Sequence, residues 1–187
     1  MEMRLSALAA GLVLALAVAS PLAGQEGAAP PPDLLEITGT VTVSGADRFV
    51  AREHFVERLD SGAEVRISWL GADFKKRFLD KIEEHVDPAQ LGVHRLRRAA
   101  PDTPIIAAIG ERHETTLSHV WNALKQQPKG EPGALLTDST PNVFFVRDAR
   151  GVLWAVDLVW GGAGWEIGAS AVDDRRPWRA GRQIISR

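Results

Sequence analysis

The sequence predicts an α+β fold in a single domain, with antiparallel meanders at both ends of the folded part and a helical middle. Three observations support this prediction. Short apolar runs separated by glycine-bearing turns fill residues 141–187. A strict alternation of apolar and polar residues covers 36–44, and a four-residue apolar period covers 73–86. The chain has 187 residues, which suits one domain better than two, and we place that domain at 34–187.

The first 24 residues have the pattern of a secretory signal peptide. Arg4 precedes an apolar run over 5–19, and small residues follow it. Cleavage after Ala17-Val-Ala19 or after Leu22-Ala-Gly24 predicts a mature start at Ser20 or Gln25. The alternative is an uncleaved anchor, because the apolar stretch approaches the ~20 residues that span a bilayer. We favour cleavage, which predicts a periplasmic or secreted protein without a membrane contact after removal of the leader.

Composition narrows the class of protein further. Residues 25–33 are rich in Pro, Ala and Gly and predict a semi-rigid linker. The chain has no cysteine, so we expect neither a lipid-modified N-terminus nor a disulfide, and the fold must depend on its apolar core. A net charge of -2 gives no bulk attraction for nucleic acid, and we expect no nucleic-acid partner.

The N-terminal β region is predicted to contain three strands in a meander. Ile37, Val41 and Val43 alternate with threonines, which is typical of a half-buried strand over 36–44. Mixed alternation suggests a second strand over 49–58, and a third is expected over 63–69. Turn residues around Gly45 and Gly62 separate the three segments.

The middle of the chain is predicted to be helical. Residues 73–86 carry apolar residues every four positions and charged residues between them, which indicates an amphipathic helix. A second helix is expected to start at Asp87-Pro88. A third is expected over 103–110, with Thr103 as its cap, Pro104 in its first turn and Gly110 at its end.

A fourth helix is expected to open at Thr115 or Thr116 and to end at 128–130. Its predicted apolar face consists of Leu117, Val120, Trp121 and Leu124.

The C-terminal region is predicted to form a second meander over 142–147, 152–160, 165–172 and 178–187. Gly151 suits a hairpin turn with a left-handed residue, and 161–164 is a second permissive turn. We expect Trp160 and Trp165 to face each other and stack. Period-2 counting predicts one face made of Trp154, Val156, Leu158, Trp160, Trp165, Ile167, Ala169 and Ala171.

The tryptophans are the main binding candidates in the sequence. Indoles stack on the apolar faces of sugars, so Trp154, Trp160, Trp165 and Trp178, with Arg182 beside them, are candidate ligand-binding residues. The alternative is that this aromatic stripe belongs to the core. Trp178 is the indole that we expect to be most exposed, because it follows Arg-Arg-Pro in a loop.

Catalytic signals are weak, and we predict no metal and no cofactor. A zinc-protease helix needs His-Glu-x-x-His, but Leu117 stands where the second histidine should follow His113-Glu114, and His119 comes two residues late. No Gly-x-Ser-x-Gly motif occurs. Acid–base chemistry around His113, Glu114 and Asp138 remains an alternative, as a small hydrolase.

Several segments resemble a family of uncharacterised bacterial proteins over nearly the whole folded part. The segments that carry the resemblance are Trp69-Leu-Gly-x-x-Phe74-Lys-Lys-x-Phe78, Pro104-Ile-Ile-Ala-x-Ile109-Gly, Asn142-Val-Phe-Phe-Val-Arg-Asp148 and Trp178-x-x-Gly-x-x-Ile-Ile-Ser-Arg187. The resemblance implies a single domain, and it implies no activity and no catalytic residue.

Together these patterns predict an exported protein that acts as a non-enzymatic binding or interaction module of the cell envelope. The expected ligand surface is the tryptophan-rich C-terminal sheet, and the expected partner is a glycan or an envelope protein. The hydrolase described above is the alternative.

Overall fold

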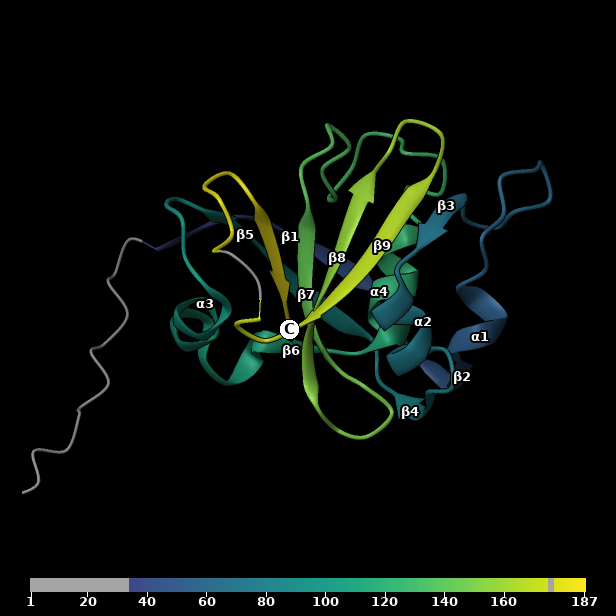
Figure 1. Ribbon diagram of the computed structural model, residues 1–187, viewed down its shortest axis with the longest axis horizontal. Helices are drawn as coiled ribbons and strands as arrows, with labels where there is room; N and C mark the ends of the chain where they lie inside the picture. Colours follow the sequence, from purple (N-terminus) through teal and green to yellow (C-terminus); the bar gives the residue numbers. More distant parts are fainter. Residues whose placement is uncertain (1–33, 175–176) are drawn as a thin grey trace, which may run out of the picture.

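The computed structural model describes residues 34–174 and 177–187, which contain helices and strands in a single sheet-rich domain (Figure 1). The expected signal peptide (1–24) and linker (25–33) lie outside the described residues. Among the residues that are described, no helix has both the length and the apolar character needed to cross a membrane.

The main sheet has eight strands. Seven of them form a continuous path, and the short strand β6 (Glu114–Thr115) pairs with β7 beside that path. The spatial order of the seven is β1 (Leu35–Val43), β5 (Ala89–Leu96), β10 (Gln183–Ser186), β7 (Asn142–Arg147), β8 (Leu153–Trp160), β9 (Trp165–Ala171) and β3 (Ile67–Leu70). Three pairs are parallel, namely β10–β7, β6–β7 and β3–β9, and the other pairs in this sheet are antiparallel.

Apolar clusters cover both faces of this sheet. Phe144 and Val146 of β7 belong to the larger cluster, which also contains residues of α2 (Ala72–Phe78) and α4 (Leu117–Leu124). Val143 and Phe145, which alternate with them, belong to a second cluster with α3 (Asp102–Ile109). In Figure 1, α3 accordingly lies on the left, whereas α1 (Ala51–His54), α2 and α4 lie on the right.

The C-terminal hairpins follow the predicted faces. Strands β7, β8 and β9 are consecutive antiparallel neighbours, and the eight residues predicted for one face all belong to or pack against the larger cluster. Trp160 lies opposite Trp165 in the register. Their ring centroids are 5.5 Å apart and the rings are inclined by 70°, so the indoles meet edge to face instead of stacking.

The last segment does not continue the C-terminal meander, so the prediction for 178–187 is wrong in its pairing. Only residues 183–186 form a strand, and β10 inserts between β7 and β5. Trp178 instead forms an isolated bridge with Ala100. The apolar pair Ile184 and Ile185 explains this position, because both side chains are fully buried, one in each cluster.

The predicted N-terminal meander is also wrong. Strand β1 pairs with β5, and β2 (Ala46–Val50) pairs with β4 (Ile82–Val86) in a separate two-stranded sheet. Strand β3 lies parallel to β9 at the far edge of the main sheet. The three segments therefore find partners that are distant in sequence instead of one another.

The expected strand over 49–58 breaks at its start. Residues 51–54 form the short helix α1, which places Ala51 and Phe55 on the same side, one turn apart. Both side chains are buried in the larger cluster with Phe49. Burial alone does not distinguish the two elements, because a strand would also place these three odd-numbered residues on one face.

The expected helix over 73–86 ends halfway, and the helix expected from Pro88 is absent. Helix α2 stops at Phe78, after which 82–86 form β4 and 89–96 form β5. Ile82 is half-exposed, whereas Phe74 and Phe78 are fully buried, so the apolar stripe does not continue. The middle of the chain is therefore mixed instead of helical.

The next two helices are present, with a different cap for the first. Helix α3 begins at Asp102 and has no side-chain cap. Thr103, the predicted cap, lies within the helix instead, and its hydroxyl and amide both donate to Asp173. Gly110, at φ 77°, ends it as predicted. Thr116 caps α4, and its hydroxyl oxygen accepts the His119 amide at 3.1 Å.

Candidate functional site

The candidate tryptophans do not share one surface. Trp154 is 7% exposed and Trp165 is fully buried, and both belong to the larger cluster. Their Nε1–H groups donate to Asp148 Oδ2 at 3.2 Å and to the Gln127 carbonyl at 2.9 Å. Trp160 is partly buried against the same cluster. These three indoles are therefore parts of the core. The two that are almost completely enclosed, Trp154 and Trp165, both donate their N–H group to an acceptor in the protein.

The expected exposure of Trp178 is wrong. This indole is 6% exposed, lies in the cluster on the opposite face of the sheet, and donates to Asp102 Oδ1 at 2.7 Å. Arg182 is half-buried, and its carbonyl accepts the Leu96 amide at 2.8 Å. The exposed indole is that of Trp69, on the edge strand β3, with half of its surface accessible.

The three residues of the hydrolase alternative do not converge. His113 and Glu114 lie beside the end of β7, where Arg147 pairs with Glu114, and this pairing raises the pKa of Arg147. Asp138 precedes the start of β7, and hydrogen bonding to Thr140 lowers its pKa. Opposite ends of one strand hold these groups, so they cannot act together on one small substrate.

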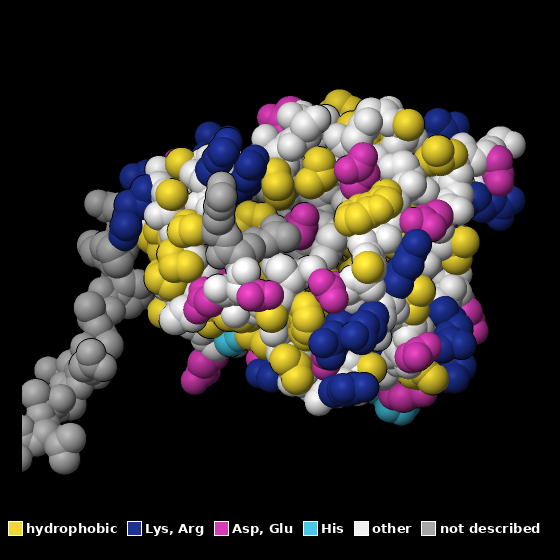
Figure 2. Space-filling view, in the orientation of Figure 1, with side chains coloured by type: hydrophobic (Ala, Val, Ile, Leu, Met, Phe, Trp, Pro, Cys, Tyr) yellow, Lys and Arg dark blue, Asp and Glu magenta, His cyan; other side chains and the backbone are white. Residues whose placement is uncertain are grey.

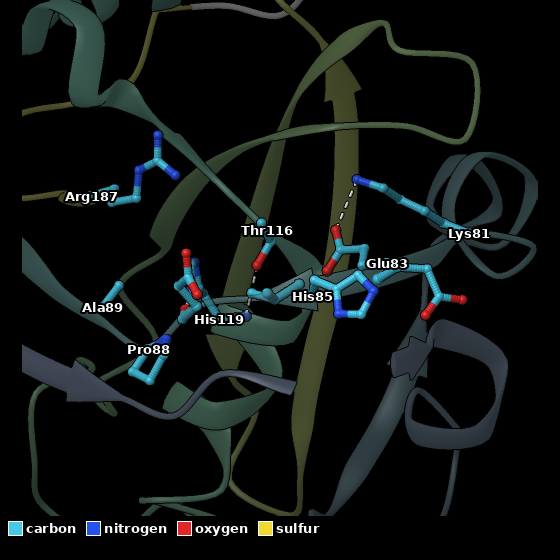
Figure 3. A pocket seen from close by; sticks show the side chains of 11 residues that line it. Lys81, Glu83, His85, Pro88, Ala89, Thr116, His119 and Arg187 are labelled. Atoms are coloured by element: carbon cyan, nitrogen blue, oxygen red, sulfur yellow. Dashed lines mark hydrogen bonds and ion pairs between the residues drawn. The ribbon is translucent and has the colours of Figure 1, made fainter. Parts of the chain in front are cut away.

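A cavity with converging polar groups lies at β4. It has a volume of about 370 Å³, and residues 81 and 83–89, Thr116, His119 and Arg187 line it. We call it the β4 pocket. Figure 3 shows these side chains, with Arg187 and His85 on opposite sides of Thr116 in that view. Its size falls within the range of roughly 300–1,000 Å³ that is usual for small-ligand sites.

Glu83 forms the fixed part of this pocket. Its carboxylate accepts the Leu117 and Ser118 amides at 2.9 and 2.8 Å, and Lys81 Nζ lies 2.9 Å from it. The amides belong to the first turn of α4, where a negative charge also interacts favourably with the helix dipole. The carboxylate is therefore a structural anchor between β4 and α4, and it has few acceptor positions left for a ligand.

His119 supplies the least satisfied polar atom of the pocket. Its Nε2 lies 2.9 Å from the Asp87 carbonyl, so the ring proton must be on Nε2 for a hydrogen bond to form. Nδ1 is then an acceptor, and it has no hydrogen-bond partner among the described residues although the side chain is only 2% exposed. An unpaired buried polar atom costs about 1–3 kcal/mol, so a donor at this position would be favourable.

The mouth of the pocket carries groups that are free to bind. The side chains of His85, Asp87 and Arg187 have no hydrogen-bond or ion-pair partner among residues 34–174 and 177–187. His85 has φ 51°, a left-handed conformation that is unfavourable for a residue other than glycine by about 1–2 kcal/mol. Such strain is concentrated at functional sites, and here it turns the chain from β4 toward β5.

A metal-binding role has no geometric support in the part of the chain that the structure describes. No group of three His, Cys, Asp or Glu side chains comes close enough there to hold an ion. His113 makes a 2.7 Å contact from Nδ1 to the Gly110 carbonyl, whereas His119 lies on α4 in the β4 pocket. His113 and His119, the two histidines considered as metal ligands, therefore have different neighbours in the structure.

Comparison with known proteins adds no further assignment. No family model, no curated protein and no solved structure matches this chain. This result is in keeping with the resemblance to an uncharacterised bacterial family. The geometry of the β4 pocket is therefore the basis for the functional argument.

Most of this pocket is hidden in the sequence, because the apolar period over 73–86 predicts one helix there. In that helix Glu83 and His85 would be solvated surface residues. The available signal was the order His85-Val-Asp87-Pro88, in which the residue before proline favours an extended backbone and a turn. His119 was considered only as a metal ligand.

Proposed function

We propose that this chain is an exported, non-enzymatic binding module of the cell envelope and that its ligand occupies the β4 pocket. The observation that carries the proposal is the unpartnered Nδ1 of buried His119 inside a cavity with free side chains at its mouth. Export is inferred from the leader pattern in residues 1–24. A periplasmic or secreted location follows from the same pattern.

A glycan is the ligand class that these groups fit best. His119 Nδ1 and the Asp87 carboxylate accept hydrogen bonds, whereas the Arg187 guanidinium donates them. Sugar hydroxyls act both as donors and as acceptors, so one sugar ring satisfies both kinds of group. The face in Figure 2 carries both charges mixed together, and the net charge of the chain is only -2, so neither gives a strong attraction of one sign.

The tryptophan-rich sheet supports this role as a scaffold. Strands β7, β8 and β9 bury their indoles and hold the rest of the sheet in place. Rigid elements position binding groups more accurately than loops do. The pocket is built where β4, the start of α4 and the residue after β10 meet.

Binding to the β4 pocket is testable by NMR. We would titrate the purified protein with soluble muropeptides, chitooligosaccharides and a neutral hexose oligomer, and follow the backbone amide signals. We expect one ligand class to shift the amides of Val86, Ala89 and Thr116, which line the pocket or border it. Shifts confined to another surface, or no shift with any of the ligands, would disprove the assignment.

Two variants sharpen this test. His85→Asn keeps a residue that tolerates the left-handed backbone but removes the imidazole, and Arg187→Ala removes the guanidinium. Each should weaken binding about three- to tenfold, the equivalent of one lost hydrogen bond. Arg179→Ala is the matched control, because Arg179 is exposed and does not line the pocket.

A further inference from the structure

A second cavity lies between the β2–β3 connection and α4. Its volume is about 190 Å³, and it shares no residue with the β4 pocket. His54 and Trp121 supply aromatic rings, and Val56 and Val65 supply apolar walls. The carboxylate-bearing residues of the lining are Glu53 and Glu64. We call it the α1 pocket, after the helix that carries His54.

The two aromatic rings of the α1 pocket pack against each other and against phenylalanine side chains of the core. The His54 ring stacks on Phe49, with centroids 4.4 Å apart and planes inclined by 8°. It meets Trp121 at 5.1 Å and 41°, and Phe55 packs edge-on against the same indole at 5.5 Å. These contacts fix the two rings, so binding here would not require their reorganisation.

Trp121 differs from the other enclosed indoles. It is 4% exposed, yet its Nε1–H has no hydrogen-bond acceptor among the described residues, whereas Trp154, Trp165 and Trp178 each have one. Buried indole N–H groups usually find a partner. The Trp121 N–H is not one of the enclosed side-chain polar atoms that lack a partner, so it remains accessible to solvent at the α1 pocket.

Charge at the α1 pocket favours a cation. The Arg58 guanidinium is 2.7 Å from Asp60, and Lys125 Nζ is 3.0 Å from Glu64, so both basic groups are already paired. Glu53 has no ion pair with a basic group among the described residues, and it remains as the unbalanced charge.

The electrostatics at the His54 ring also favour a positively charged ligand. Burial lowers the pKa of His54, Glu64 and Glu53 act to raise it, and Lys125 has the weakest influence of these groups. The imidazole is therefore mostly neutral at neutral pH, and the two carboxylates outweigh the nearby lysine.

We propose that the α1 pocket binds an alkylammonium group between the rings of His54 and Trp121 and the carboxylates of Glu53 and Glu64. A cation gains energy over aromatic faces as well as from the carboxylates. The volume is below the range for a whole drug-sized ligand, so it fits the charged end of a ligand and not a complete sugar chain. This site is separate from the β4 pocket and does not depend on the proposed glycan function.

The test uses the Trp121 indole N–H signal in the NMR spectrum of the full-length protein, assigned with Trp121→Phe. The probes are n-butylammonium, choline and 3,3-dimethyl-1-butanol, a neutral isostere of choline. We expect the two cations to shift the signal in a saturable way and the neutral alcohol to leave it unchanged. Stronger binding of butylammonium would point to a primary amine such as a lysine side chain, and stronger binding of choline to a quaternary amine.

Glu53→Gln should weaken cation binding at least fivefold, because it removes the unbalanced charge without removing a fold contact. Glu36→Gln is the control, since Glu36 is an exposed residue of β1 that pairs with Arg97. Equal binding of the neutral isostere, or equal affinity in Glu53→Gln, would overturn the proposal. His85→Asn and Arg187→Ala should not affect cation binding, which separates a failure here from a failure of the β4 assignment.

Discussion

Trp178 Nε1 donates a 2.7 Å hydrogen bond to Asp102 Oδ1, and this contact joins two segments that are 76 residues apart. Asp102 Oδ2 accepts the Asp173 amide at 2.8 Å. The carboxylate is 1% exposed, so two donors from the segment before β10 compensate for its burial at the start of α3. This contact fastens the connection between β9 and β10 to the sheet face that α3 covers.

Asp102→Ala should lower the free energy of unfolding by about 2–4 kcal/mol. The substitution leaves two donors without their acceptor, and one of them is a buried indole N–H. Urea unfolding followed by circular dichroism measures the change. Asp47→Ala removes an exposed side chain that has no hydrogen bond or ion pair among the described residues, and it should stay within about 0.5 kcal/mol of the parent. Equal effects of the two substitutions would contradict the anchoring role.

Glu83→Ala should destabilise the protein more than Thr116→Ala does. The Glu83 carboxylate serves two amides of α4 and lies beside Lys81, whereas Thr116 caps one amide. We expect a loss of about 2–4 kcal/mol for the first and about 1 kcal/mol for the second. Chemical denaturation with both variants in parallel checks this order, and the reverse order would show that β4 and α4 are held together in another way.

Three glycine-to-alanine substitutions should differ in how much stability they remove, according to the backbone conformation and the space around each glycine. A side chain at Gly130 would overlap the Trp160 indole, and the backbone there has φ 72°. Gly151 has φ 80° with open space around it, and Gly39 has open space and no left-handed backbone. We expect Gly130→Ala to lose the most stability, Gly151→Ala about 1 kcal/mol and Gly39→Ala close to nothing. Thermal unfolding of the three variants measures the ranking, and a mild Gly130→Ala would contradict the close approach of Trp160.

His94 should make stability depend on pH in the acid range. Burial lowers its pKa in the folded state below the ordinary 6.5, and Nε2 lies 2.9 Å from Ser186 Oγ. As the pH falls through 6.5 the unfolded chain takes up a proton that the folded chain does not, so the folded state loses stability. This loss levels off once the pH is below the folded-state pKa.

Replacing His94 by Gln should therefore reduce the rise of stability with pH just below 6.5. Urea unfolding at several pH values measures that slope, and an NMR titration of the His94 ring gives the folded pKa directly. His54 contributes with the same sign, because burial also lowers its pKa, so part of the slope should remain. An unchanged slope in the variant would contradict the assignment to His94.

Quenching of tryptophan fluorescence should report mainly on Trp69. Its side chain is half-exposed, and the indoles of Trp121, Trp154, Trp165 and Trp178 are almost completely enclosed. Trp69→Phe should remove more than half of the emission that acrylamide quenches, with a small remainder from Trp160. Trp178→Phe should leave the quenchable part unchanged, and a large decrease there would indicate that the β9–β10 connection opens in solution.

The hairpins of the C-terminal region were predictable because their signals are local. Alternating apolar residues around Trp154 and the turn at Gly151 define each strand without information from elsewhere in the chain. The partners of β1 and β10 lack such signals. Each pairs with β5, and nothing within either segment encodes that distant strand.

The error at 73–86 has a simple geometric cause. Residues four positions apart lie on the same side of a helix, but they also lie on the same side of a strand, because four is a multiple of two. The spacing of Ile82 and Val86 was therefore compatible with either element, and the buried Phe74 and Phe78 biased the interpretation toward a continuous helix. The β4 pocket depends on this strand and was hidden by the same ambiguity.

The central position of β10 makes the two parts of the main sheet depend on a late event in synthesis. Strands β1 and β5 stand on one side of it and β7, β8, β9 and β3 on the other, and along the described path β10 alone connects them. A chain that has been synthesised only as far as residue 182 still lacks the strand that joins these two groups, so the main sheet cannot be completed before the last residues are made.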